Sequence, residues 1–180
     1  MNEGSGAKDG TRRRAGRPVG ERSVLQCGRV RVSIPWAVAA AVMVVFIWSN
    51  STVPGDDSSS ASLGVVAAVQ GALQALGLPS GWVTNLLVRK TGHLLEYAAL
   101  GALVSQASDP DRSPARSWLP LVIVVLAAVP AIDETIQLFV PGREGRFADV
   151  VLDWTGASLG VLVRMLIVRT GRRGEEPSSP

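Results

Sequence analysis

Residues 118–140 read WLPLVIVVLAAVPAIDETIQLFV, an apolar segment with no charged residue before Asp133 and Glu134. An α-helix rises 1.5 Å per residue, so a helix of this length extends about 35 Å and can cross the hydrocarbon core of a bilayer. Three other segments are similarly rich in Leu, Val and Ala: 32–49, 86–106 and 147–168. The pattern predicts an all-α, multi-pass transmembrane bundle of four spans.

The segment 61–78 is apolar as well, but it contains three glycines and places Gln70 and Gln74 on one helical face. We expect an interfacial or re-entrant helix here, because a fifth span would distribute the basic residues less asymmetrically. With four spans, 14 of the 18 Lys and Arg residues lie on the side of the two termini, and with five spans only 12 do. Since cytoplasmic segments carry the excess of positive charge, four spans with both termini in the cytoplasm are predicted.

The two ends of the chain are basic and polar. Residues 1–31 hold eight of the 18 cations in a Gly-, Arg- and Ser-rich sequence without apolar periodicity, so we expect a disordered cytoplasmic arm. Residues 32–168 are the predicted membrane domain, and residues 169–180 are a short cytoplasmic tail. A basic arm can bind nucleic acid, but this one lacks interleaved aromatic residues and adjoins an apolar segment. Its predicted role is to orient the membrane domain.

The predicted spans carry charged residues close to the ends that share the outer side. Arg89, His93 and Glu96 follow at i, i+4 and i+7, so they lie on one stripe of the second span. The third and fourth spans each place two polar residues four apart, again on one face. The residues expected to converge there and to bind a ligand are Arg89, Lys90, His93, Glu96, Asp133, Glu134, Gln137, Arg143, Arg146, Asp149 and Asp153.

The cost of these charges limits how they can be arranged. An ionised side chain at the centre of a membrane helix costs about 2.5–3.5 kcal/mol on insertion scales, so the charges must pair or face water. Four cations, five carboxylates and one histidine make the predicted cluster close to neutral. One interpretation is a structural ion-pair network that holds the helices in register. The other, which the number of charges favours, is a polar pocket that opens outward.

Three motifs follow one another along the chain. They are Arg89-Lys90-x-x-His93-x-x-Glu96-Tyr97, then Asp133-Glu134-x-x-Gln137 with Pro141-Gly142-Arg143, then Asp149-Val-Val-Leu-Asp153 with Gly156-Ala157. In this order, and within residues 34–167, the chain resembles the VanZ-like family, named for a teicoplanin-resistance membrane protein. The resemblance implies a small multi-pass envelope protein, with resistance to teicoplanin-type glycopeptides in some members and no agreed biochemical activity. Asp153 departs from the family pattern, which usually has Asn at this position.

His93, Glu96 and Asp133 are the candidates for acid–base catalysis, because carboxylates and burial together tune the proton affinity of a histidine. No strong nucleophile accompanies them, so a non-enzymatic role is favoured. One cysteine, Cys27, and one histidine exclude a Cys/His zinc framework and a disulfide network. Zinc at His93 would need three carboxylates. We therefore expect no metal site and no cofactor.

The basic residues Arg89, Lys90, Arg143 and Arg146 are expected to line the rim of the pocket. Guanidinium groups suit bidentate contact with phosphate or carboxylate. The expected partners are the lipid bilayer and an anionic lipid or lipid-linked cell-wall precursor, with no nucleic acid and the oligomeric state left open. The favoured function is to engage this anionic envelope component and affect glycopeptide susceptibility. The alternatives are an intramembrane enzyme acting on a lipid-linked envelope substrate, and a small ion or proton conductor.

Gly156 and Gly160 lie four residues apart in the last predicted span. Small residues at this spacing let two membrane helices approach closely. We interpret the pair as a packing contact within the bundle, in preference to the seam of a dimer.

Overall fold

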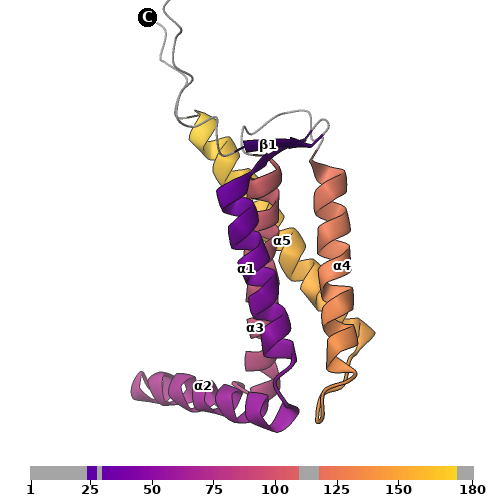
Figure 1. Ribbon diagram of the computed structural model, residues 1–180. Helices are drawn as coiled ribbons and strands as arrows, with labels where there is room; N and C mark the ends of the chain where they lie inside the picture. Colours follow the sequence, from indigo (N-terminus) through magenta and orange to yellow (C-terminus); the bar gives the residue numbers. More distant parts are fainter. Residues whose placement is uncertain (1–23, 28–29, 110–117, 174–180) are drawn as a thin grey trace, which may run out of the picture.

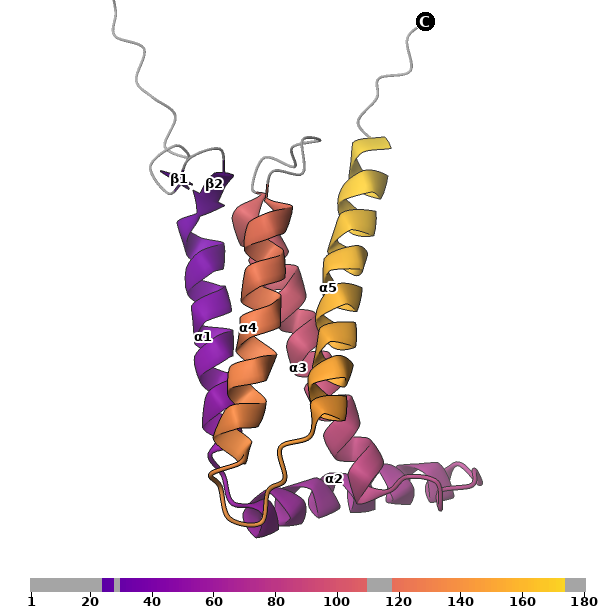
Figure 2. The ribbon, with the colours of Figure 1, turned by 90° about the vertical axis from the view of Figure 1, so that its right-hand side faces the viewer.

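The computed structural model describes residues 24–27, 30–109 and 118–173. Four of its helices run side by side as a bundle, and a fifth lies across one end of that bundle (Figures 1 and 2). The elements in chain order are β1 (Val24–Cys27), β2 (Val30–Ser33), α1 (Ile34–Ser51), α2 (Gly55–Ala75), α3 (Asn85–Ser108), α4 (Leu119–Gln137) and α5 (Phe147–Arg173). The predicted helical class is confirmed.

Among the described residues, three helices are long and apolar enough to cross a membrane: α1, α4 and the segment Phe147–Thr170 of α5. They also present an apolar outer surface, on which Val42 is 63% exposed, Ile123 63% and Ile167 65%. Water-exposed surfaces rarely gather so many large apolar side chains, whereas a lipid environment accepts them. Helix α3 has 24 residues and is long enough to cross a membrane, but charged residues interrupt the apolar sequence of its first half. Composition therefore supports three of the four predicted spans.

Helix α2 lies across the end of the bundle at a steep angle to the other helices (Figures 1 and 2). It begins at Gly55, six residues before the apolar segment 61–78 from which a helix was expected, and only Gly55 and Val66 are buried in it. The backbone N–H of Gly55 donates a hydrogen bond of 3.0 Å to the carbonyl oxygen of Pro141, in the loop between α4 and α5. We call this end of the bundle the α2 end, and the opposite one the hairpin end.

At the hairpin end, β1 and β2 form a short antiparallel hairpin that pairs Val24 with Ser33 and Cys27 with Val30. This corrects the expectation of a disordered arm for 24–27 and 30–31. Apolar and β-branched residues on both sides of the dipeptide Gly28-Arg29 are a hairpin signature that the prediction did not use. The rest of the arm lies outside the described residues.

Helix α5 is longer than the predicted span. It continues to Arg173, so residues 169–173, expected in the tail, are helical. Arg169 lies in this added part of the helix, and a cation near the C-terminal end of a helix interacts favourably with the helix dipole. Residues 174–180 lie outside the described part of the chain, and so do residues 110–117 between the second and third predicted spans.

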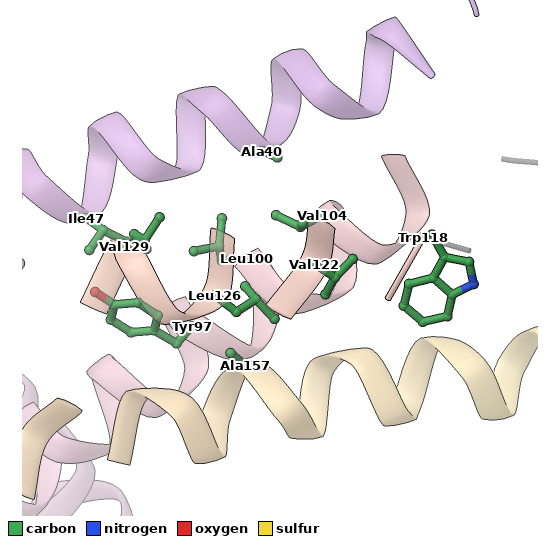
Figure 3. Close-up of a cluster of buried hydrophobic side chains, with 10 residues drawn as sticks. All are labelled: Ala40, Ile47, Tyr97, Leu100, Val104, Trp118, Val122, Leu126, Val129 and Ala157. Carbon is green, nitrogen blue, oxygen red and sulfur yellow. The ribbon is translucent and has the colours of Figure 1, made fainter. Parts of the chain in front are cut away.

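The apolar core lies on the hairpin side of the bundle's middle, with α3 at its centre. Tyr97, Leu100 and Val104 of α3 are buried against side chains from α1, α4 and α5 (Figure 3). The Tyr97 hydroxyl points along the cluster toward Ile47, in the direction of the α2 end (Figure 3). Nearer the hairpin end, the buried guanidinium of Arg164 donates to Gln106 Oε1 (2.9 Å), Asp109 Oδ2 (3.0 Å) and the Asp109 carbonyl (2.7 Å).

Helices α3 and α5 make the closest helix contact, through glycines. A Cβ atom at Gly156 would meet the backbone of Leu94, one at Gly160 the backbone of Ala98, and one at Gly101 the backbone of Ala157. Only glycine permits backbones to approach so closely. The predicted role of Gly156 and Gly160 in packing within the bundle is therefore confirmed, and this contact sets the register that brings the polar residues together.

Candidate functional site

Four helices bring polar residues to one level near the α2 end. The end of α1, the start of α3, the end of α4 and the start of α5 all lie there (Figures 1 and 2). By helical rise, His93 lies about 12 Å along α3 from its start, Asp133 about 6 Å before the end of α4, and Asp153 about 9 Å along α5. Neighbouring helices therefore place these three side chains at similar depths.

The centre of the site is a buried acidic cluster around the histidine. Asp133 and Asp153 are fully buried, and Glu134 is 6% exposed. The Nδ1 atom of His93 lies 3.4 Å from Oδ1 of Asp153. Ligand atoms of His93, Asp133 and Asp153 all lie within 4.8 Å of one another. Residues from α3, α4 and α5 thus meet at one point inside the bundle.

Hydrogen bonds connect α1 to this cluster. The side-chain amide of Gln137 donates to Asp133 Oδ2 at 3.3 Å and to Ser51 Oγ at 3.4 Å. The amide of Asn50 donates to Glu96 Oε1 at 3.2 Å. Asn50 and Ser51 were not predicted as site residues. The available signal was their position just after the first predicted span, at the same predicted level as the ends of the other segments that carry the acids.

A side chain of the site also binds the loop between α4 and α5. Glu134 Oε2 accepts a hydrogen bond of 2.8 Å from the backbone N–H of Arg146, just before α5 begins. An acidic acceptor at this place satisfies a free N–H and complements the positive end of the helix dipole. The side chain of Arg146 is exposed and pairs with Glu144, while Lys90 pairs with Asp149. Glu144 was not among the predicted site residues.

Two cavities open beside the cluster. The first has a volume of about 410 Å³ and is lined by Lys90, Arg146 and Asp149 among others. The second has about 350 Å³ and lies against α1, α2 and α3, with Glu96 in its wall. Three further residues line both cavities: Arg89, His93 and Arg143. All of the predicted cations therefore border a cavity.

Arg89 and Arg143 differ in how they are held. The guanidinium of Arg143 donates to two carbonyl oxygens at the end of α1, those of Asn50 (2.8 Å) and Val53 (3.1 Å). Burial, and then the nearby positive charge of Arg89, lower the pKa of Arg143 from its ordinary value. Within the described part of the chain, Arg89 itself makes no hydrogen bond and no ion pair. A partly buried cation with a like charge beside it attracts anions.

The sequence model of the VanZ/LLP1 family matches residues 36–168, which is most of the chain and includes every residue of the site. The chain belongs to the VanZ/LLP1 family. Together with its apolar helices, this makes it a VanZ-like membrane protein. No curated protein and no solved structure matches it.

In this VanZ/LLP1 protein, the eleven predicted site residues fall into two groups. The inner group consists of the histidine and the side chains around it, and the outer group consists of charged residues that border the first cavity. The inner residues are His93, Glu96, Asp133, Glu134, Gln137 and Asp153. The outer residues are Arg89, Lys90, Arg143, Arg146 and Asp149. Four of the five acids thus lie in the inner group, while all four cations and Asp149 lie at the rim.

Proposed function

We propose that this VanZ/LLP1 protein crosses the membrane four times, with both termini in the cytoplasm and α2 along the outer surface. The start of α1 and the end of α5 lie at the same end of the bundle, as an even number of spans requires (Figure 2). The charged residues that interrupt the apolar sequence of α3 lie at the α2 end, where Arg89 and Lys90 border a cavity. A reporter fused after Pro79 and one fused after Arg173 test this topology. We expect extracytoplasmic and cytoplasmic signals, respectively, and the reverse or equal signals contradict it.

We further propose that the cavities at the α2 end bind an anionic component of the cell envelope. The observation that supports this most directly is Arg89, which borders both cavities together with Arg143, makes no ion pair within the described residues and lies near enough for its charge to act on the Arg143 guanidinium. Two guanidinium groups at one opening repel each other until an anion lies between them, and their planar donors match phosphate oxygens.

The size and position of the site suit a phosphate-bearing headgroup. A volume of about 410 Å³ lies within the range of small-molecule sites. In the proposed topology the opening lies at the level of outer-leaflet headgroups, where lipids and lipid-linked cell-wall precursors carry phosphate. Binding such a precursor would change how teicoplanin-type glycopeptides reach their target, which is the proposed cellular effect.

The test of binding uses the full chain in nanodiscs of phosphatidylcholine. Undecaprenyl phosphate and, separately, phosphatidylglycerol are added, and the bound lipid is measured by native mass spectrometry. Arg89→Ala should lower the binding at least tenfold. Arg169→Ala is the matched control, because Arg169 is exposed near the hairpin end. Equal binding by the two variants and the unsubstituted protein contradicts the proposal. A stronger loss for one of the two lipids identifies the source of the phosphate.

The cellular effect has its own test. The full chain is expressed in a glycopeptide-susceptible host, and the teicoplanin concentration that inhibits growth is measured. We expect this concentration to rise with the unsubstituted chain and with Arg169→Ala, and to stay at the host value with Arg89→Ala or Arg143→Ala. The same inhibitory concentration with all chains and with the empty host refutes the link to glycopeptides.

A second function, an intramembrane enzyme for a lipid-linked envelope substrate, is favoured by one observation. His93 borders both cavities and lies next to the buried Asp153, so a proton-accepting group is reachable from the site. In this function His93, Glu96 and Asp133 exchange protons with the substrate. The purified chain would then convert extracted lipid-linked precursors, and His93→Ala would abolish the conversion. Precursors left chemically unchanged by an active preparation would exclude this function.

A further inference from the structure

Three potential metal ligands meet inside the bundle, each from a different helix. His93 comes from α3, Asp133 from α4 and Asp153 from α5, and their ligand atoms lie within 4.8 Å of one another. Two ligand atoms of a tetrahedral ion are about 3.4 Å apart, so side-chain movements of up to about 1.4 Å would bring this arrangement to coordination. We propose that His93, Asp133 and Asp153 bind one divalent metal ion, of the Zn²⁺ or Mn²⁺ class.

The buried carboxylates have unused hydrogen-bonding capacity. Both oxygens of Asp153, which is fully buried, make no hydrogen bond, and the same holds for Oδ1 of the fully buried Asp133. His93 Nδ1 also has no hydrogen-bond partner. Buried polar atoms in native proteins are nearly always satisfied, and an unsatisfied group is a sign of an ion or water that the site requires. Asn85 Oδ1 and the Tyr97 hydroxyl are unsatisfied as well, and all three residues that come within coordination distance belong to this unsatisfied set.

The distance between His93 and Asp153 fits a shared ion better than a direct bond. A charge-assisted hydrogen bond between imidazolium and carboxylate is about 2.7–2.9 Å long. The observed separation of Nδ1 and Oδ1 is 3.4 Å. Two ligands at about 2.1 Å in tetrahedral geometry around zinc are separated by about 3.4 Å. The histidine and the aspartate therefore already stand at the spacing of two ligands of one ion.

The charge of the surroundings points to a cation as well. Beyond Asp133 and Asp153, the inner group contains two further acids, Glu96 and Glu134, while the cations of the site lie at the rim. Lys90 pairs with Asp149, and Arg143 donates to backbone carbonyls. Two buried carboxylates with a neutral imidazole carry two negative charges, which one divalent ion balances.

The donor set also selects the class of metal. Ca²⁺ takes six to eight oxygen ligands, more than this site offers, whereas one imidazole with two carboxylates suits Zn²⁺ and Mn²⁺. Three protein ligands leave a position for water or another ligand. Because His93 borders both cavities, the cluster is reachable from the α2 end. This proposal does not depend on the anion-binding function.

The experiment uses the full chain with a tag free of histidine, purified in detergent and treated with EDTA that is then removed. Calorimetric titration with ZnCl₂ and MnCl₂ should show one ion per chain. His93→Gln and Asp153→Asn should each weaken the affinity at least tenfold, because each removes a ligand. Asp56→Asn is the matched control, since Asp56 is an exposed carboxylate at the start of α2. The bound ion should also raise the melting temperature of the unsubstituted chain and of the control only.

Equal affinity in His93→Gln, Asp153→Asn and the control, or no binding by the folded unsubstituted chain, overturns the proposal. X-ray absorption at the zinc edge of the unsubstituted chain gives a reading that does not require the variants to fold: one imidazole nitrogen with oxygen ligands is expected, and a spectrum with sulfur or oxygen alone refutes the site. The lipid-binding test of Arg89→Ala is repeated in EDTA, where no metal ion is bound. Its result tells a failure of the metal site apart from a failure of the anion site.

Discussion

Alanine at Gly156 or Gly160 tests whether the glycine contact between α3 and α5 holds the bundle together. A Cβ atom at Gly156 would lie 2.5 Å from the carbonyl oxygen of Leu94. Unstrained carbon–oxygen contacts are about 3.3 Å or longer, so the two helices would have to separate by roughly 0.8 Å at this point. At Gly160 the overlap with the Ala98 backbone is greater still.

The size of the effect follows from this separation. A radial gap of 0.5–1 Å forfeits a quarter to a half of the dispersion attraction between the atoms on either side. We expect each single substitution to lower the free energy of unfolding by about 1–3 kcal/mol, the usual cost of overpacking. The double variant should lose less than the sum of the two, because the first substitution has already moved the helices apart.

The assay is equilibrium unfolding of the purified chain in mixed micelles with increasing dodecyl sulfate, followed by tryptophan fluorescence. Gly71→Ala in α2 is the control, because a Cβ atom there meets nothing within 4 Å. Alanine favours helix over glycine, so this control should be about 0.5–1 kcal/mol more stable than the unsubstituted chain. If Gly156→Ala and Gly160→Ala are stabilised like Gly71→Ala, the close contact of α3 and α5 is wrong.

Two further predictions concern other contacts and use the same unfolding assay. Arg164→Met removes three hydrogen bonds of a buried guanidinium and should lower the free energy of unfolding by about 3–5 kcal/mol. The control is Arg169→Met at an exposed position, which should change the free energy of unfolding by less than about 0.5 kcal/mol. Equal losses of stability in the two variants would show that the Arg164 contacts contribute nothing specific. Glu134→Ala removes the acceptor of the Arg146 N–H and should cost about 1–2 kcal/mol, while Glu134→Gln, which keeps an acceptor, should cost less than half as much. A larger loss in the glutamine variant would contradict this helix-capping role.

The helices and their apolar faces were predictable because hydropathy and helical rise are local properties. The run before Asp133 predicted α4, and the absence of charge in 32–49 predicted α1. The hairpin before α1 was missed, because its eight residues lie in a basic segment whose composition is typical of disorder. Helix α2 was expected to begin too late in the chain, because its first turns are polar and lie outside the apolar segment on which the prediction relied.

The grouping of the site residues was predictable from their depth, but their pairing was not. Spacing of four residues placed Asp149 and Asp153 on one face, yet Asp149 pairs with Lys90 while Asp153 lies beside His93. A helical face is about 100° wide, so the rotation of each helix decides which neighbour a side chain meets. Asn50 was missed for the same reason, because nothing local indicates that α1 turns it toward Glu96.

The sequence by itself determined that this is a helical membrane protein with polar residues at similar positions along its apolar helices, because hydrophobic length and position along a helix are local properties of the sequence. Only the tertiary structure decided which acids pair with a lysine or arginine and which lie in the interior around His93. The glycines of α5 let it approach α3, and this approach places Asp153 against His93 and Asp133, away from the cations at the rim. Packing between helices far apart in sequence thus separates the charges into an acidic interior and a basic opening.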